Sequence, residues 1–93
     1  MMPERNVFFT CEECAEKLYP RKGKFINQEI QLASHVKICI NDEGYKEHLW
    51  IEVIEVLENT VRGKIVNYPV IVRVVFGQKI TFNLSEIEDV IFR

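Results

Sequence analysis

The sequence is poor in the features that mark several specialised classes of protein. It has only four glycines, and they form no Gly-rich loop of the kind that cradles phosphates. Its longest apolar runs are short, such as Val70–Val72, whereas a membrane-spanning helix needs ~20 apolar residues. Residues 1–6 are not followed by the apolar core of a signal peptide. We therefore expect a cytoplasmic protein with no membrane partner.

The charge and cysteine content exclude further classes. Twelve Lys and Arg face fourteen Asp and Glu, for a net charge of −2, so no basic excess points to nucleic acid. Three cysteines cannot all pair within one chain, which suits reduced thiols in the cytosol. The 47% hydrophobic and 28% charged fractions are typical of a folded globular chain. With no linker or repeat, residues 1–93 are expected to form a single domain.

The first third of the chain predicts a helix followed by an ambiguous stretch. Thr10 and Glu13 have the spacing of a capping box, and Pro20 ends the pattern, so a helix is predicted over residues 11–19. Residues 25–34 fit neither the helical nor the strand period cleanly, and we favour a strand or loop there.

The rest of the chain alternates in the manner of strands joined by short turns. Residues 49–57 are apolar on both faces, which predicts a central strand covered on both sides. A second capping box at residues 85–88 predicts a short C-terminal helical turn. The expected fold is α+β: one N-terminal helix packed on a curled, mostly antiparallel sheet, partly open and barrel-like. Strands are expected at 35–40, 49–57, 60–66, 70–76 and 79–83.

A set of spaced residues in this second part resembles a known family. The first segment, residues 47–53, contains Glu47, Trp50 and Val53. The other three segments are residues 63–69, 77–82 and 87–89. Their order and spacing over about residues 36–91 are similar to the bacterial domain-of-unknown-function family 2314, the YegJ-like proteins. Gln78 and Val90 depart from the family's preferred Asp and Trp. The resemblance implies no established enzymatic activity, and similar small domains are placed among the immunity proteins of toxin systems.

The motif residues have structural interpretations. Trp50 is expected in the core, Gly63 at a bulge or under a close contact with Trp50, and Gly77 in a turn that needs a positive φ. Asn67 is expected to bond its own backbone beside the strand break at Pro69. The full set of family-motif residues read as structural is Glu47, Trp50, Gly63, Asn67, Pro69, Gly77 and Asp89.

Four residues invite a zinc site as an alternative to a metal-free protein. They are Cys11, Cys14, His35 and Cys39, all ligand types that zinc accepts. In a strand, however, His35 and Cys39 lie ~13 Å apart, too far to share one ion. Cys11 and Cys14 also have the spacing of a redox dithiol, although the βαβ context of such proteins is missing. The favoured interpretation is two small, reduced residues on the inner face of the helix.

The leading functional hypothesis is a small non-enzymatic protein-binding module without a cofactor, acting as a monomer or homodimer. Its partner is another protein, and an immunity- or anti-defence-like role is one form of it. Interfaces favour aromatic and Arg side chains, so we predict a partner-binding patch at His48, Arg62 and Tyr68. The alternatives are a zinc-stabilised adaptor and a Cys-x-x-Cys redox protein.

Overall fold

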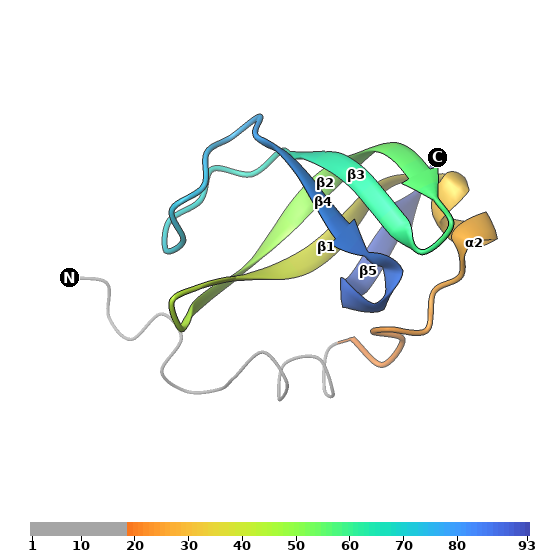
Figure 1. Ribbon diagram of the computed structural model, residues 1–93, viewed down its shortest axis with the longest axis horizontal. Helices are drawn as coiled ribbons and strands as arrows, with labels where there is room; N and C mark the ends of the chain where they lie inside the picture. The colour runs from red at the N-terminus through yellow and green to blue at the C-terminus, as the bar shows by residue number, and fades with distance from the viewer. Residues whose placement is uncertain (1–18) are drawn as a thin grey trace.

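The computed structural model describes residues 19–93, and within them five strands form one antiparallel sheet (Figure 1). The strand order is β4-β3-β2-β1-β5, so β2 is central and β4 and β5 are the two edges. One short helix, α2 (Asn27–Gln31), precedes the strands, and a 3-10 turn, η1 (Leu84–Glu86), precedes β5. The strands are β1 (Ala33–Asp42), β2 (Tyr45–Leu57), β3 (Thr60–Ile65), β4 (Lys79–Asn83) and β5 (Ile87–Phe92).

The expected α+β, barrel-like class is therefore wrong for the described chain. The fold is mostly antiparallel sheet, its only helix there has five residues, and the sheet does not close. The predicted helix over residues 11–19 lies outside the described residues, apart from its last residue.

Two tight turns set the register of the central three strands. At the first, Glu43 and Gly44 have φ of 53° and 93°, and the Asn41 side chain accepts the Gly44 N–H at 2.9 Å. At the second, Glu58 has φ of 53°. Glycine tolerates such backbone at low strain, which suits Gly44, whereas Glu43 and Glu58 are non-glycine residues that adopt it in the tight turns. These turns bring Ile38 opposite Leu49, with both side chains in the core.

The C-terminal segment departs from its predicted helical turn. Helical geometry ends with η1, and from Ile87 the chain is an extended strand that pairs with β1. Ile87 is fully buried opposite Ile38, and the pairing satisfies the edge of β1 that would otherwise be open. The prediction missed this strand because its hydrogen bonds come from β1, about fifty residues earlier in the chain.

Two further local predictions are wrong. Residues 27–31 are helical rather than strand or loop, because the Glu29 carboxylate accepts the Ile26 N–H at 3.1 Å and Ile30 is fully buried. Residues 70–76 form no strand. They belong to the long connection between β3 and β4, residues 66–78, which extends away from the sheet in Figure 1.

The core lies on the inner face of the curled sheet, and α2 closes one end. The Asn27 side chain donates to the Glu58 carbonyl at 2.8 Å, which ties the helix to the β2–β3 turn. The buried apolar residues are Phe25, Ile30, Ala33, Val36, Ile38, Leu49, Ile51, Val53, Val61, Ile65, Val72, Phe82, Leu84 and Ile87.

Trp50 is not among these core residues. It is half-buried on the opposite, outer face of β2, with the Lys37 ammonium 5.6 Å from its ring centroid. Glu52 and Ile54 of the same face are exposed, so the expectation that β2 is covered on both sides fails there. Within residues 19–93 there is no helix with the length and hydrophobicity needed to cross a bilayer.

Candidate functional site

The structure separates the three residues of the predicted patch. Arg62 lies close to the β2–β3 turn, where its guanidinium is 3.5 Å from the Glu55 carboxylate. Tyr68 lies six residues further on, in the connection that follows the end of β3. His48 packs against Tyr19, with ring centroids 5.7 Å apart. Tyr68 alone of the three is strongly exposed, at 78%.

Tyr68 belongs to the connection between β3 and β4, which we call the 66–78 loop. Its two ends are joined by backbone hydrogen bonds, from Gly77 N–H to Ile65 O at 2.7 Å and from Ile65 N–H to Gln78 O at 2.9 Å. Gly77 has φ of 88°, as its predicted turn requires. The loop therefore leaves the sheet and returns to it at one point.

A single carboxylate holds the middle of the 66–78 loop. Glu47 of β2 accepts the backbone N–H groups of Val70, Ile71 and Val72 at distances of 2.8–3.1 Å. Hydrogen bonds to a charged acceptor contribute ~1.5–3 kcal/mol each in favourable settings. These N–H groups point at a side chain instead of a neighbouring strand, which explains why a β-branched run does not form a strand here.

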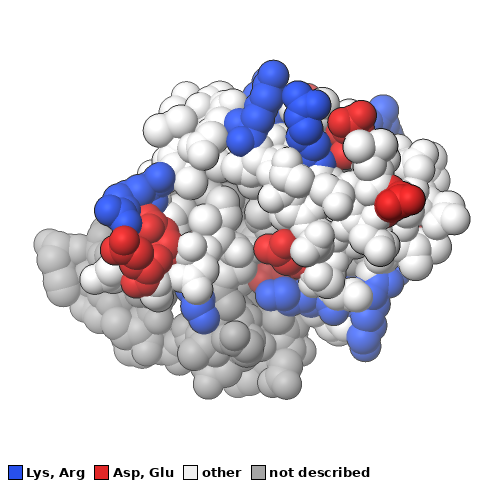
Figure 2. Space-filling model, in the orientation of Figure 1, with Lys and Arg blue, Asp and Glu red and all other residues white. Residues whose placement is uncertain are grey.

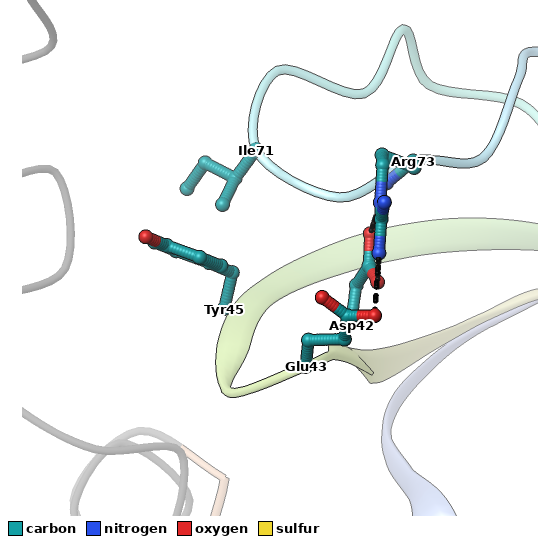
Figure 3. A pocket seen from close by; sticks show the side chains of 5 residues that line it. All are labelled: Asp42, Glu43, Tyr45, Ile71 and Arg73. Atoms are coloured by element: carbon teal, nitrogen blue, oxygen red, sulfur yellow. Dashed lines mark hydrogen bonds and ion pairs between the residues drawn. The ribbon is translucent and has the colours of Figure 1, made fainter.

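A second contact anchors the loop to the β1–β2 turn (Figure 3). The Arg73 guanidinium pairs with Asp42 at 2.9 Å and with Glu43 at 3.1 Å, and the Arg73 N–H also donates to Asp42 at 2.8 Å. These bonds lower the pKa of Asp42 from 3.8 to about 2 and raise the pKa of Arg73. Tyr45 and Ile71 lie beside the pair and complete the lining of a cavity of about 280 Å³.

The outer surface of this braced loop is apolar. The rings of Tyr68 and Phe76 stack with centroids 4.6 Å apart and planes 18° apart, and Phe76 is 47% exposed. Val70 and Val75 are each 64% exposed. We call these four residues, Tyr68, Val70, Val75 and Phe76, the loop surface. Apolar side chains gathered on one exposed loop are a feature of interaction sites.

Charge borders the loop surface instead of lying within it. In Figure 2 the end of the molecule that carries the 66–78 loop shows a group of paired charges, and further Lys and Arg side chains lie along the upper border. Arg73 of the loop is exposed and pairs with Asp42 and Glu43. Lys64 and Lys79 are paired across β3 and β4 beside the two ends of the loop, and Lys79 is exposed. Lys64 is 3.6 Å from Glu52. The four apolar residues of the loop surface are therefore bordered by charged side chains, of which Lys79 is exposed.

The remaining motif residues make local structural contacts at the loop, in β3 and in β5. The Asn67 side chain accepts the Trp50 N–H at 2.6 Å, a bond to the neighbouring strand instead of to its own backbone, and Pro69 follows in the loop. Gly63 lies at a bulge in the β2–β3 ladder, and the side chain packed on it is Ile51 instead of Trp50. Asp89 is exposed on β5 and accepts the Val90 N–H at 2.9 Å.

A second cluster lies on the outer face of the sheet, where β1, β2 and β5 are neighbours. Glu88 is 1% exposed, and its carboxylate is 2.6 Å from His48 Nδ1 and 3.4 Å from Lys22 Nζ. Cys39 pairs with His48 in the β1–β2 register, so the two side chains share a face. One ligand atom from each of Cys39, His48 and Glu88 lies within 4.8 Å of the others.

Sequence reasoning missed Glu88 in this cluster. An acid next to the buried Ile87 is expected to point outward to solvent. It is buried because the segment before α2 runs beside β5, with the Gly23 N–H donating to Ile87 O at 3.2 Å and Lys22 covering the carboxylate. No local pattern signals that contact, because it joins residues more than sixty positions apart.

The zinc site predicted as an alternative does not assemble from the described residues. His35 and Cys39 both lie in β1, four positions apart. The His35 ring is hydrogen-bonded to the Ser34 hydroxyl, with 2.8 Å between Nδ1 and Oγ. Cys11 and Cys14 lie outside the described residues. Cys39 is disulfide-bonded, so the expectation of reduced cysteines is wrong for this residue.

Comparison with known proteins supplies one finding. The model of a family described as an uncharacterized protein conserved in bacteria, DUF2314, matches residues 12–93. This range includes the motif residues and extends further toward the N-terminus than the resemblance drawn from them. No curated protein and no solved structure gives a significant match to the chain.

Proposed function

The chain belongs to the DUF2314 family of uncharacterized proteins conserved in bacteria, and from that premise we propose that it is a small, non-enzymatic protein-binding module that acts through the loop surface. The observation that carries the proposal is the exposed Tyr68–Phe76 stack on a braced loop. Aromatic side chains are enriched in the centres of protein interfaces and supply most of the binding energy there.

Bracing matters because a preorganised loop loses less conformational entropy on binding. Glu47 and Asp42, which lie in β2 and β1, hold the backbone from Val70 to Arg73. Four exposed apolar side chains are thus presented in one arrangement before any partner arrives. Rigid scaffolds that carry their recognition residues on loops are common among binding proteins.

The surroundings of the loop surface support a partner of defined chemistry. The exposed ammonium of Lys79 and the neighbouring Lys64 lie at the loop's base. A protein surface with an apolar centre and an acidic margin is complementary to this arrangement. The chain carries a net charge of −2, so the selectivity comes from this local margin and not from its overall charge.

An immunity- or anti-defence-like role in the bacterial cytoplasm is one concrete form of this proposal. The partner is then a toxin or defence protein, and binding blocks it. We expect co-expression of the chain to relieve growth arrest caused by the product of an adjacent gene. A variant with Tyr68→Ala and Phe76→Ala should fail to relieve it.

The binding role is tested by selective loss of a partner. Wild-type protein, the Tyr68→Ala/Phe76→Ala variant and a matched Leu57→Ala control are used to capture proteins from bacterial lysate. Leu57 is also exposed, at 60%, but lies at the opposite end of β2. We expect a protein that the wild type and the control retain and the double variant loses.

The affinity for the purified partner then measures how much Tyr68 and Phe76 contribute to binding. Loss of a hot-spot residue is worth ~2 kcal/mol or more, which is roughly a 30-fold rise in Kd. Titration calorimetry should show that rise for the double variant and less than a threefold change for Leu57→Ala. If the double variant, shown to be folded by circular dichroism, retains every partner of the wild type, the loop surface is not the binding site.

A further inference from the structure

We propose that Cys39, His48 and Glu88 form a zinc site that becomes available when the disulfide of Cys39 is reduced. The three ligand atoms are the Cys39 sulfur, a ring nitrogen of His48 and a carboxylate oxygen of Glu88. They come from three adjacent strands, β1, β2 and β5, whose order and pairing fix their positions. This site shares only Cys39 with the set suggested by the sequence spacing.

The distances fit a zinc ion after a small adjustment. Zinc bonds of ~2.0–2.3 Å in tetrahedral geometry place neighbouring ligand atoms ~3.3–3.8 Å apart. The three atoms already lie within 4.8 Å of one another. His48 Nδ1 and the Glu88 oxygen, now 2.6 Å apart, share a hydrogen bond that the ion would replace. Their separation needs to open by ~0.7 Å to reach a zinc geometry.

One oxygen of the Glu88 carboxylate faces the cluster and the other faces Lys22. Glu88 is buried, and its Oε2 faces Lys22 at 3.4 Å while its Oε1 faces His48. Lys22 therefore orients the carboxylate without occupying the oxygen that faces the cluster. A zinc ion would neutralise this carboxylate and the Cys39 thiolate together. A thiolate and an imidazole in the same set select zinc over the oxygen-preferring Mg²⁺ and Ca²⁺.

Redox chemistry controls whether this ligand set exists. Cys39 is disulfide-bonded in this structure, and a disulfide sulfur is not the thiolate that zinc binds. Reduction by a dithiol such as dithiothreitol breaks the S–S bond, leaves two protein thiols and converts the dithiol to its cyclic disulfide. Hydrogen peroxide reverses the change: two thiols give up two hydrogens to form the disulfide and two water molecules. Zinc binding to Cys39 displaces the proton of its thiol to solvent, which leaves the thiolate as the ligand.

The test measures zinc binding by the full chain in both redox states. Reduced protein and peroxide-oxidised protein are titrated with Zn²⁺ in competition with a chromophoric chelator. We expect one equivalent of zinc on the reduced protein and at least 100-fold weaker binding on the oxidised protein. Cobalt substitution of the reduced protein should give a thiolate-to-metal charge-transfer band that disappears in Cys39→Ser.

Conservative variants assign the ligands. His48→Asn and Glu88→Gln should each weaken zinc binding by at least ~100-fold, since even outer partners of metal ligands contribute 10–100-fold. The matched controls are His35→Asn and Glu52→Gln, which change the same residue types on neighbouring positions of β1 and β2 and should leave the affinity within threefold. His48→Asn and Cys39→Ser keep the test valid if Glu88→Gln does not fold.

A variant lacking the other two thiols separates this site from a cysteine-pair site. If Cys11→Ser/Cys14→Ser retains zinc while His48→Asn or Glu88→Gln loses it, the proposal stands. If both sets of variants lose zinc, Cys39, His48 and Glu88 are ligands of a larger shared site, and the proposal also stands. Zinc that survives His48→Asn and Glu88→Gln, or reduced protein that binds none, overturns it.

Discussion

Replacing Gly63 by alanine tests how closely β2 and β3 approach each other. Gly63 is buried in β3 opposite Val53, next to the bulge in the β2–β3 ladder. A Cβ at this position would lie 2.4 Å from Ile51 Cγ2 and 2.6 Å from the carbonyl oxygen of Glu52. Gly63 is not among the residues with positive φ, so its lack of a side chain matters for contact and not for backbone conformation.

The loss of stability in Gly63→Ala depends on which of the two contacting groups can shift away from the new Cβ. Cβ contacts below 3.0 Å essentially do not occur, so Ile51 Cγ2 must retreat by about 0.6 Å, from 2.4 to 3.0 Å. The Glu52 carbonyl is backbone in a hydrogen-bonded ladder and cannot retreat without disturbing the pairing. Overpacking costs ~1–3 kcal/mol, and backbone involvement puts Gly63→Ala at the upper end, about 3 kcal/mol. At ~4–8 °C per kcal/mol, Tm should fall by roughly 12–24 °C.

The assays are thermal unfolding, which gives Tm, and urea unfolding, which gives the free energy. Both are followed by the fluorescence of Trp50, with Gly44→Ala as the control. Gly44 has φ of 93° and no atom within 4 Å of its Cβ position, so alanine there should cost only the ~1–2 kcal/mol of left-handed backbone. Gly63→Ala should destabilise the Ile51→Ala variant less than it destabilises the wild type, because the Ile51 side chain is one of the two groups that it meets. Without the clash, alanine in a strand is favoured over glycine by ~0.5–1 kcal/mol. A stabilised Gly63→Ala protein would therefore refute the reasoning.

Three other predictions concern the loop and the outer face of the sheet. Glu47→Ala removes the acceptor for three loop N–H groups, so hydrogen exchange at residues 70–72 should accelerate at least tenfold while the exchange of core amides in β1 stays unchanged. Because Arg73 lowers the pKa of Asp42 from 3.8 to about 2, the stabilisation by this pair should be complete above about pH 4 and lost as the pH falls through 2. In Arg73→Gln, carboxyl NMR titration should show the pKa of Asp42 rising back toward 3.8. An unchanged pKa would mean that Arg73 is not the group that lowers it. Trp50→Ala should cost less than the ~3–5 kcal/mol typical of a fully buried Trp, because the ring is half-buried, and a larger loss in urea unfolding would place it in the core.

These predictions separate two regions with different chemistry. The loop surface is apolar, exposed and held by carboxylates behind it, which suits recognition of a protein. The cluster at Glu88 is polar, largely buried and built from three strands, which suits an ion. Because β2 supplies Glu47 to one region and His48 to the other, substitutions in this strand should be tested for both partner binding and zinc affinity.

Local sequence patterns were sufficient for the β1–β2 and β2–β3 hairpins and for the family. The β4 bounds, residues 79–83, match the prediction. β1 extends the predicted strand 35–40 by two residues at each end, and β2 extends the predicted strand 49–57 toward the turn that it shares with β1. Period-two alternation and turn residues such as Gly44 act over a few positions, so they can be recognised without knowing the rest of the chain. The family match over residues 12–93 likewise confirms the resemblance carried by the spaced motif residues.

Tertiary structure alone decided the conformation of the ambiguous segments and the make-up of both candidate sites. Residues 70–76 have the composition of a strand, but Glu47 takes three of the N–H groups that a neighbouring strand would need. Ile87–Phe92 becomes a strand because the edge of β1 is available to it. Cys39, His48 and Glu88 meet only through the pairing of three strands. Each of these outcomes depends on a partner group far away in the chain, and periodicity carries no information about which distant group will be adjacent.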